Sequence, residues 1–527
     1  MKNLKYFLLA AMGIMAAPTL AQETYQDTKL AENGLTGTAR YVGMGGAMEA
    51  LGADISTISS NPAGVGMFRK SQVTLSAGVV AQTDADTKVN FDNTTIQFDG
   101  KKSRPSFDQV GVVWAAGQSK NTYINLAFNY HKSNNFSQIL AAANYLGGAS
   151  ESKLTSRKYD YCLALKDKYG SDYASMLWTA VDANYESLMN KSTDGSSMAY
   201  YDGTAYLFGQ YQKGYIGVYD FNISGSINNR VWLGLTVGIH DVNYKSNSMY
   251  SENLDGGATS DAFEALKIDG TGFDVKAGVI FRPVKDSPFR IGAYFNTPVY
   301  YDLTMNGTHS LSLVDNGNRG DKSNGITYDY RFNTPWKAGV SLSHTVGNYL
   351  ALGATYEYAW YDHMDNRIKD GGYYDSWYGD YYETSSSDDA MNDNTRESLK
   401  GVSTLKLGLE YKPMPMLALR LGYNYVSSMF KENGYRDQSI ASPGVAYATS
   451  SDYTNWKSIN RITCGIGYNY KQFSVDVAYQ YSGQKGDFYP FMSYYDGDGV
   501  QANDCVAPVA EVKNNRHQVL MTLGYKF

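Results

Sequence analysis

The chain has 527 residues, and its 46 Lys and Arg residues are outnumbered by 52 Asp and Glu residues, which gives a net charge of -6. This balance argues against a nucleic-acid-binding protein, which needs a basic surface to neutralise phosphates. An aromatic fraction of 14% is too high for a disordered chain, and 3 cysteines are too few for a disulfide scaffold or a cysteine metal cluster. Beyond the N-terminus, no apolar run reaches the roughly 18 residues that a transmembrane helix needs.

The first 21 residues have the features of a secretory signal peptide. Lys2 and Lys5 precede an apolar stretch over residues 6–17, and the small residue Ala21 follows it. This pattern predicts export with cleavage after Ala21. Together with the many Tyr and Gly residues, it indicates a protein of the bacterial outer membrane.

From residue 71 onward, long segments alternate apolar residues with polar or small ones. Leu233, Leu235 and Val237, for example, are separated by Gly234 and Thr236. Period two predicts strands with one apolar and one polar face. The segments approach the roughly 9–11 residues that a tilted strand needs to cross a bilayer, and aromatic residues gather at their ends as in the girdles of membrane barrels.

Short and long connections alternate along these segments, as expected for a bacterial barrel with an even strand count. The sequence therefore predicts an all-β fold, a 14-stranded antiparallel transmembrane β-barrel over residues 71–527, with short periplasmic turns and long extracellular loops. The expected strands are 71–83, 108–118, 121–131, 215–227, 230–244, 272–283, 288–301, 332–345, 349–361, 402–412, 416–427, 459–470, 473–484 and 515–527. The expected long loops are 84–107, 132–214, 245–271, 302–331, 362–401, 428–458 and 485–514.

The last expected strand carries an apolar face that ends on Phe527. A terminal amphipathic strand that ends in an aromatic residue resembles the signal read by the outer-membrane assembly machinery, so that machinery is an expected partner. Membrane lipid and lipopolysaccharide are the other expected surroundings of such a barrel.

Residues 22–70 precede the first strand, lack period two and are rich in Gly and Ala. They could fold inward as a plug or form a loose periplasmic extension, since termini are often disordered unless they are held in place. An Asn61-Pro62-Ala63 step is followed by Met67-Phe68 and the first strand. This segment resembles the N-terminal hatch of the FadL/TodX family of outer-membrane transporters for long-chain fatty acids and other hydrophobic compounds. The residues that we assign to the hatch motif are Gly43, Gly45, Gly46, Asp54, Asn61, Pro62, Ala63 and Gly64.

The resemblance implies a barrel closed by its own N-terminus, with a periplasmic hatch inside the lumen. It implies passive transport: outer loops capture a hydrophobic ligand, the hatch rearranges, and the ligand leaves sideways into the membrane beside a kinked strand. A fatty acid needs such an apolar path, because each exposed methylene costs roughly 0.8 kcal/mol in water. A purely structural role, folding the plug without touching the ligand, is the alternative for each motif residue.

Loop 132–214 is too long to lack structure in a compact protein. The pattern predicts helices over residues 136–146 and 173–189, the second with Leu177, Val181 and Tyr185 on one stripe. The stripe could capture an apolar ligand above the pore or simply pack on the barrel rim.

The sequence predicts neither an enzyme nor a metal or cofactor site. His131 and His363 fall at outer strand ends without an evident Ser or Asp partner, and the six histidines lack metal-ligand spacing. Cys162 and Cys505, both in expected outer loops, could pair. A carboxylate headgroup would need a cation in the lumen, and the candidates are Lys276, Arg290, Lys337 and Arg420.

Three other functions fit a barrel of this kind. A porin or receptor for a polar or haem-like ligand would owe little selectivity to its N-terminal segment. A surface adhesin would act through its Tyr- and Asp-rich loops. A barrel hydrolase would depend on His131 or His363.

Overall fold

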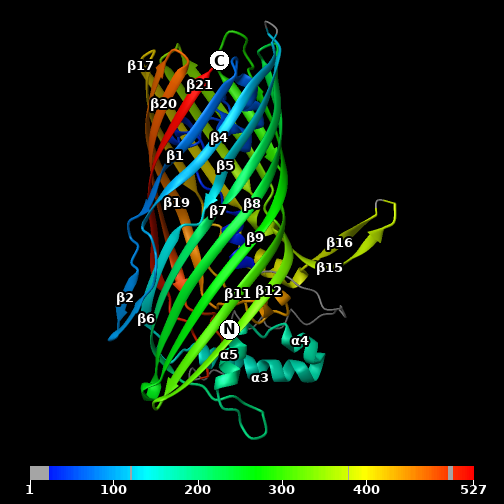
Figure 1. Ribbon diagram of the computed structural model, residues 1–527, viewed down its shortest axis with the longest axis vertical. Coiled ribbons are helices and arrows are strands. Elements are labelled where there is room, and N and C mark those ends of the chain that lie inside the picture. Colours follow the sequence, from blue (N-terminus) through cyan, green and yellow to red (C-terminus); the bar gives the residue numbers. More distant parts are fainter. Residues whose placement is uncertain (1–22, 119–120, 378, 497–502) are drawn as a thin grey trace.

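The computed structural model describes residues 23–118, 121–377, 379–496 and 503–527 (Figure 1). The expected signal peptide, residues 1–21, lies outside the described residues. In the part of the chain that is described, no helix combines the length and apolar character needed to cross a membrane.

Within the described residues, fourteen antiparallel strands close a ring, because the first strand pairs with both the second and the last. The ring is formed by β1 (Gln72–Gln82), β4 (Ser103–Gln118), β5 (Tyr123–Asn135), β7 (Gly203–Ile227), β8 (Val231–Leu254), β9 (Thr259–Phe281), β10 (Arg290–Asn296), β13 (Lys337–Val346), β14 (Leu350–Ala359), β17 (Val402–Met414), β18 (Leu417–Val426), β19 (Tyr453–Tyr470), β20 (Phe473–Tyr489) and β21 (Ala510–Lys526). This confirms the predicted fold class.

The strands turn their apolar faces outward. In β8, Leu233 and Leu235 are 48% and 45% exposed, whereas Thr236 and His240 between the apolar positions are buried. Because the ring closes, no strand edge is left unpaired within it. A closed ring whose lipid-facing positions are apolar and whose alternate, inward-facing positions along the same stretch are polar or small is the arrangement that spans a membrane.

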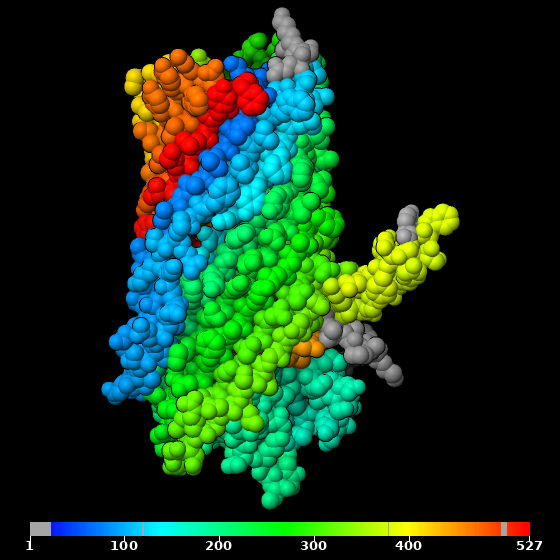
Figure 2. Space-filling model, viewed as in Figure 1, coloured from blue at the N-terminus to red at the C-terminus, as the bar shows by residue number. Residues whose placement is uncertain are grey.

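Five further strands extend the sheet beyond the ring, and two more pair separately. They are β6 (Gln138–Tyr145), β11 (Tyr300–Asp315), β12 (Asn318–Asn333), β15 (Asp365–Asp375) and β16 (Asp380–Ser387), with β2 (Lys88–Phe91) and β3 (Thr94–Gln97) as the separate pair. The long-loop end also carries η4 (Asp255–Gly257), η5 (Tyr361–His363), α6 (Asp389–Ser398) and α7 (Pro443–Ala446). The β15–β16 hairpin stands clear of the barrel wall (Figure 2).

Two expected loops are wrong. Residues 245–271 are mostly strand, since β8 runs to Leu254 and β9 begins at Thr259, and residues 302–331 form most of the β11–β12 hairpin. These extensions lie beyond the apolar belt, where both faces of a strand can be polar. The apolar alternation that guided the prediction is therefore missing, although the strand continues.

The expected strand 288–301 is interrupted. β10 ends at Asn296, Pro298 lies in the gap, and β11 starts at Tyr300 and pairs with a different part of β9. Proline has no N–H for the ladder, which explains the break. The hydroxyl of Thr297 accepts a hydrogen bond from the Val275 N–H at 3.0 Å and replaces part of the missing pairing.

A cap of helices covers the long-loop end of the barrel and comprises α3 (Glu151–Tyr169), α4 (Ser171–Ser175) and α5 (Ala180–Leu188) (Figure 1). The helix expected over 136–146 is wrong, because 138–145 pair with β7 as β6. The helix expected over 173–189 is divided into two. Its first residues belong to α4, residues 180–188 form α5, and residues 176–179 connect them. Leu177, Val181 and Tyr185 are buried, so this stripe packs within the cap.

Candidate functional site

The N-terminal segment, residues 23–70, lies inside the ring (Figure 1). It contains α1 (Thr24–Ala31), α2 (Ala39–Gly43), η2 (Ile55–Ser59) and η3 (Pro62–Met67). α2 packs on β18, β19, β20 and β21, whereas η3 packs on β5, β7, β8 and β9. The segment therefore touches opposite parts of the wall and fills the lumen between them.

Short polar side chains fix the turns of this segment. The Thr38 hydroxyl caps α2 by accepting from the Tyr41 N–H at 3.1 Å and donates to the Asp54 carboxylate at 2.8 Å. The Asn61 side chain accepts from the Ala63 N–H at 3.2 Å and donates to the Glu49 carbonyl at 3.1 Å. Asn61 thus caps η3, and Pro62 follows at the first helical position, where its missing N–H costs nothing.

Glycines let the N-terminal segment pack directly on the backbone of the wall. A Cβ on Gly422 would lie 2.1 Å from the Gly45 nitrogen, and one on Gly408 would lie 2.4 Å from the Met44 carbonyl oxygen. Gly45 itself has φ +63, and its Cβ would lie 2.8 Å from the Tyr423 nitrogen. No larger residue fits at these contacts without moving the segment or the wall.

Ion pairs join the segment to the wall at two places. The Arg40 Nε lies 3.0 Å from the Glu410 carboxylate, which also pairs with Arg420 at 2.7 Å. The fully buried Glu49 accepts from Lys406 at 2.9 Å and, on its other oxygen, from Thr355 at 2.8 Å. Both contacts place a charge of the segment against an opposite charge of the lumen, so they hold the segment in register.

The four cations predicted as headgroup candidates have different surroundings. Lys276 bridges Asp220 at 3.1 Å and Asp274 at 2.6 Å, and Arg420 pairs with Glu410 and with Asp476 at 2.6 Å. The Arg290 guanidinium donates to a carbonyl of the N-terminal segment at 2.9 Å. Three of the four are therefore engaged within the protein.

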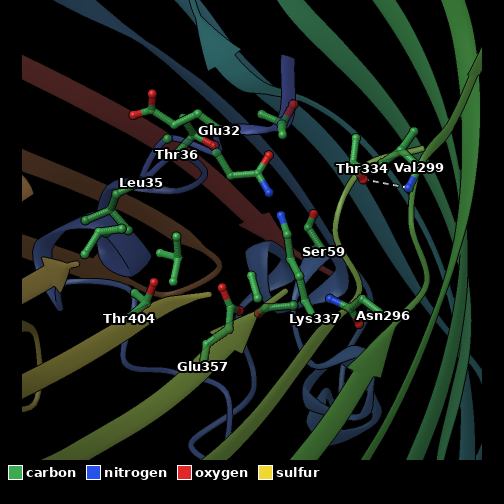
Figure 3. Close-up of a pocket in the computed structure, with 18 of the residues that line it drawn as sticks. Glu32, Leu35, Thr36, Ser59, Asn296, Val299, Thr334, Lys337, Glu357 and Thr404 are labelled. Atoms are coloured by element: carbon green, nitrogen blue, oxygen red, sulfur yellow. Dashed lines mark hydrogen bonds between the residues drawn. The ribbon is translucent and has the colours of Figure 1, made fainter. Parts of the chain in front are cut away.

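Lys337 differs from these three. Among the described residues it has no carboxylate within 4.0 Å, and it lines a cavity of about 180 Å³ between the N-terminal segment and the wall. Its side chain points into that space beside Ser59 (Figure 3). Arg461 lines the same cavity, donates to the Asn424 side chain at 2.9 Å and has no ion pair in the described chain. Arg461 is not among the four cations predicted from the sequence, because a single sequence does not show which charges pair across the barrel.

The same cavity reaches the break in the wall. Asn296, Thr297 and Val299, which span the interruption between β10 and β11, line it together with Thr334. The Val299 N–H donates to the Thr334 hydroxyl at 2.8 Å, so a side chain replaces a ladder partner here (Figure 3). None of the eight hatch-motif residues lines the cavity.

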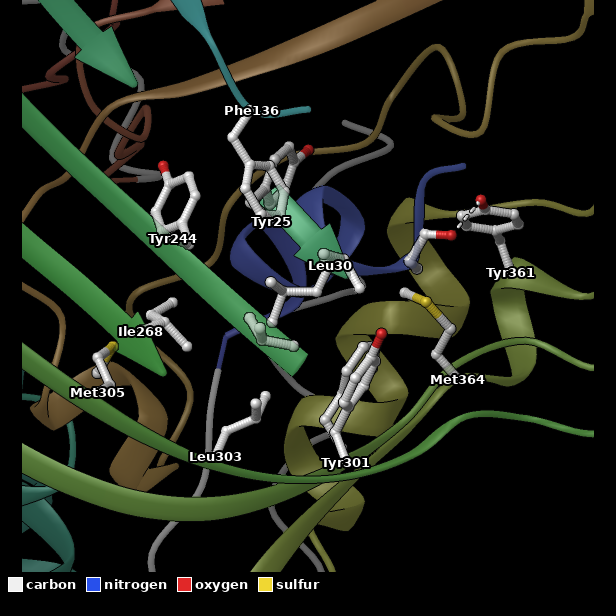
Figure 4. Packing of buried hydrophobic residues seen from close by; sticks show 14 of the residues in the cluster. Tyr25, Leu30, Phe136, Tyr244, Ile268, Tyr301, Leu303, Met305, Tyr361 and Met364 are labelled. Atoms are coloured by element: carbon white, nitrogen blue, oxygen red, sulfur yellow. Dashed lines mark hydrogen bonds between the residues drawn. The ribbon is translucent and has the colours of Figure 1, made fainter. Parts of the chain in front are cut away.

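Farther toward the long-loop end, apolar side chains line the inside of the barrel. We call the region enclosed by this cluster the apolar chamber, and α1 fills it. Tyr25, Leu30 and Ala31 of α1 are buried in a cluster of aromatic and aliphatic side chains from the surrounding strands and loops (Figure 4). Tyr25 stacks on Phe430 at 5.1 Å between ring centres. The other members of the cluster are Phe136, Ile216, Val218, Val242, Tyr244, Leu266, Ile268, Tyr301, Leu303, Met305, Tyr328, Tyr330, Phe332, Ala359, Tyr361, Met364, Leu399, Val402, Met429, Phe430 and Tyr453.

His131 has neighbours that the sequence did not reveal. The Ser59 hydroxyl lies 2.9 Å from His131 Nε2 and donates to Asp220 at 2.7 Å. In a hydrolytic triad the carboxylate accepts from the other ring nitrogen, but His131 Nδ1 is buried without a partner in the described structure. This arrangement does not orient the imidazole as a general base. His363 lies in η5, and its Nδ1 lies 3.0 Å from the carboxylate of the neighbouring Asp362.

The cap contains a buried pair of carboxyl groups. The Glu151 N–H donates to Glu252 at 2.9 Å, and the Tyr250 hydroxyl donates to the same carboxylate at 2.7 Å. Burial raises the pKa of Glu252 to about 7. Burial and the neighbouring Glu252 also raise the pKa of Glu151. The pair therefore favours its protonated form in the folded cap.

The described cysteines are unpaired. Cys162 is partly exposed, and Cys505 is buried with its thiol 3.4 Å from the Ser150 carbonyl. The pairing considered for these two is therefore not formed.

A comparison with solved structures finds several to which this chain is similar over most of its length. The chain is similar to the Ralstonia pickettii toluene transporter TbuX, with 13% identity over 94% of this chain and 99% of that chain and a TM-score of 0.47. A Pseudomonas aeruginosa FadL homologue gives 14% identity over 98% and 100% of the chains, with a TM-score of 0.48. The Pseudomonas putida toluene transporter TodX gives 13% identity, 94% and 99% coverage and a TM-score of 0.45. No protein-family description and no curated protein match the sequence.

Proposed function

We propose that this chain is an outer-membrane channel for the passive transport of long-chain fatty acids or similar hydrophobic compounds. The observation that carries the proposal is the apolar chamber inside the barrel, in which α1 lies among aromatic side chains. A pore for polar solutes has a polar lumen, whereas an apolar chamber suits a molecule that loses roughly 0.8 kcal/mol for each methylene exposed to water.

α1 is suited to make way for such a molecule. It has only 8 residues, fewer than the roughly 12–15 that a helix needs to persist alone in water. Its Asp27 is fully buried, and burial raises the pKa of that carboxyl. Asp27 lies near Asn366 and Asp388 and is not part of the apolar cluster. Because α1 brings this acid into a buried place, it gains less from burial than an apolar ligand would.

The cavity beside Lys337 is the second place in the barrel where we expect the transported molecule to bind. Lys337 and Arg461 offer cationic groups to a carboxylate headgroup, and neither has an acid within 4.0 Å in the described chain. The cavity also meets the wall at the interruption between β10 and β11. We assign sideways release into the membrane to this interruption, where side chains replace ladder hydrogen bonds. Capture occurs at the outer loops, and the N-terminal segment acts as the hatch.

Uptake into liposomes tests the proposal. The mature protein is refolded into vesicles, and entry of labelled oleate is compared with entry of a small sugar. The intact protein should admit oleate and exclude sugar. A variant without residues 22–33, which lacks α1 but keeps α2, η2 and η3, should still exclude sugar. A variant without residues 22–68 should admit it.

The other outcomes name the alternatives. Sugar entry through the intact protein would make it a porin. Entry of neither compound, in protein whose barrel is folded by circular dichroism, would favour a receptor or an adhesin.

A further inference from the structure

The β15–β16 hairpin leaves the barrel sideways and stands clear of its wall (Figures 1 and 2). Its register places Tyr373 opposite Tyr382 and Tyr374 opposite Tyr381. Neighbouring residues of a strand point to opposite faces, so the first pair lies on one face and the second on the other. Both faces of the ribbon are therefore aromatic.

These aromatic side chains are exposed. Trp377 is 87% exposed, and Tyr373, Tyr374, Tyr381 and Tyr382 are between 41% and 65% exposed. Tyr373 and Tyr382 stack on each other at 5.7 Å, but neither is buried by the rest of the protein. A free two-stranded hairpin is marginally stable in water, so exposed aromatic residues on both faces call for surroundings that cover both.

The stem of the hairpin is fixed to the barrel. Lys369 of β15 pairs with Asp302 of β11 at 2.8 Å and with Glu383 of β16 at 2.9 Å, and Arg331 of β12 pairs with the same Asp302 at 3.1 Å. A network of several charges with Lys and Arg donors holds geometry better than one surface ion pair. The direction of the hairpin is thus set at its base.

That base lies at the outer end of the lipid-facing surface. The first residues of β15 pair with the last four residues of β12, which ends at Asn333. The exposed Trp336 immediately precedes β13, and the exposed Tyr356 lies on β14, which pairs with β13. Tyr and Trp at this position form the aromatic girdle that marks the headgroup layer. From there the hairpin slopes back toward the short-turn end of the barrel, that is, toward the membrane (Figure 1).

We propose that the β15–β16 hairpin is a lipid anchor, whose aromatic side chains lie in the headgroup layer of the outer leaflet beside the barrel. Tyr and Trp favour this layer because they combine an apolar ring with a polar tip. Asp370 and Glu383 at the stem, with Asp375 and Asp380 at the turn, keep the ribbon out of the hydrocarbon and so fix its depth. A partner protein would dock against one apolar face of the hairpin. A hairpin immersed in lipid is covered on both faces, and this hairpin exposes aromatic side chains on both.

Tryptophan fluorescence of the full-length mature protein in phosphatidylcholine nanodiscs tests the anchor. The signal of Trp377 is isolated by subtracting the spectrum of W377F from that of the wild type. Trp114, on the lipid-facing surface near the short-turn end, is isolated with W114F as the positive control, and Trp178 in the cap with W178F as the negative control. Lipids brominated high on the acyl chains and aqueous acrylamide serve as the two quenchers.

The proposal predicts that bromolipid quenches Trp377 to the same extent as Trp114. It also predicts that acrylamide quenches Trp377 less in nanodiscs than in the same full-length protein unfolded in guanidinium chloride. Trp178 should show no bromolipid quenching. If Trp377 resists bromolipid while Trp114 is quenched, the barrel is in the bilayer but the hairpin is not, and the proposal is overturned. The experiment involves no cargo, so its result is independent of the proposed transport function.

Discussion

Replacement of Glu49 with Gln should loosen the N-terminal segment. Glu49 is completely buried, and its carboxylate accepts from Lys406 at 2.9 Å, from Thr355 at 2.8 Å and from the Tyr41 hydroxyl at 3.0 Å. The amide keeps the size of the side chain but removes its charge, so that Glu357, at 3.8 Å, is the one carboxylate left within 4.0 Å of the Lys406 ammonium among the described residues. Removing one partner of a buried ion pair costs about 3–5 kcal/mol.

A loss of that size raises the undocked population of the segment on the order of 10²- to 10³-fold. Hydrogen exchange of residues 23–70 should accelerate accordingly, while the exchange of the barrel strands stays unchanged. Liposomes that contain E49Q should also leak a small sugar.

The matched control is the double variant E49Q/K406M. It removes the uncompensated ammonium, and the neutral amide at position 49 keeps Thr355 and Tyr41 as hydrogen-bond partners, so the pair leaves no unpaired charge behind. Exchange and sugar exclusion should therefore return toward wild type. If E49Q alone exchanges and excludes sugar like the wild type, the ion pair does not hold the segment and the reasoning is refuted.

Three further predictions follow from the site and the cap. Because burial raises the pKa of Glu252 to about 7, its contribution to cap stability is complete below the unfolded value of about 4.5 and is lost as the pH rises through about 7. Exchange protection of the cap should fall over that window, and E252Q should flatten the dependence; an unchanged profile would contradict it. K337M should weaken the binding of oleate about tenfold, as for the loss of one charge-assisted hydrogen bond, while the binding of an uncharged hydrocarbon stays the same; equal losses would deny Lys337 a headgroup role. G422V should make the barrel leak sugar, because even a Cβ there would lie 2.1 Å from a backbone nitrogen of the N-terminal segment. The control is G117A, because a Cβ added at Gly117 would have no neighbouring atom within 4 Å, and this variant should still exclude sugar. If G422V also excluded sugar, the contact between Gly422 and the N-terminal segment would be dispensable.

The sequence predicted the membrane-spanning part of the fold well, because lipid imposes a simple rule there. Leu233, Leu235 and Val237 had to face outward, and they do. Beyond the lipid the rule no longer applies. β8 continues to Leu254 through a polar stretch, and the prediction ended it early. The closed ring could be predicted from one sequence, because the alternation of apolar residues and the lengths of the connections both indicate it.

The lumen was harder to predict, since its order depends on residues that meet only after the ring closes. Lys276 and Lys337 look alike in sequence, but Lys276 lies between two aspartates and Lys337 faces a cavity. The resemblance of residues 22–70 to a hatch predicted their place inside the barrel. It did not indicate that α1 enters the apolar chamber, because α1 is short and mostly polar.

The glycine contacts between the N-terminal segment and the wall bear on how easily the barrel can open and close repeatedly. At Gly45, Gly408 and Gly422, neither surface has a side chain that must choose a rotamer when the two meet. Freezing a side chain costs up to about 2 kcal/mol, so a contact of backbone on backbone avoids that entropy loss at each return. The segment can leave and dock again as a preformed shape, and a small number of buried charges then determines how tightly the channel stays shut.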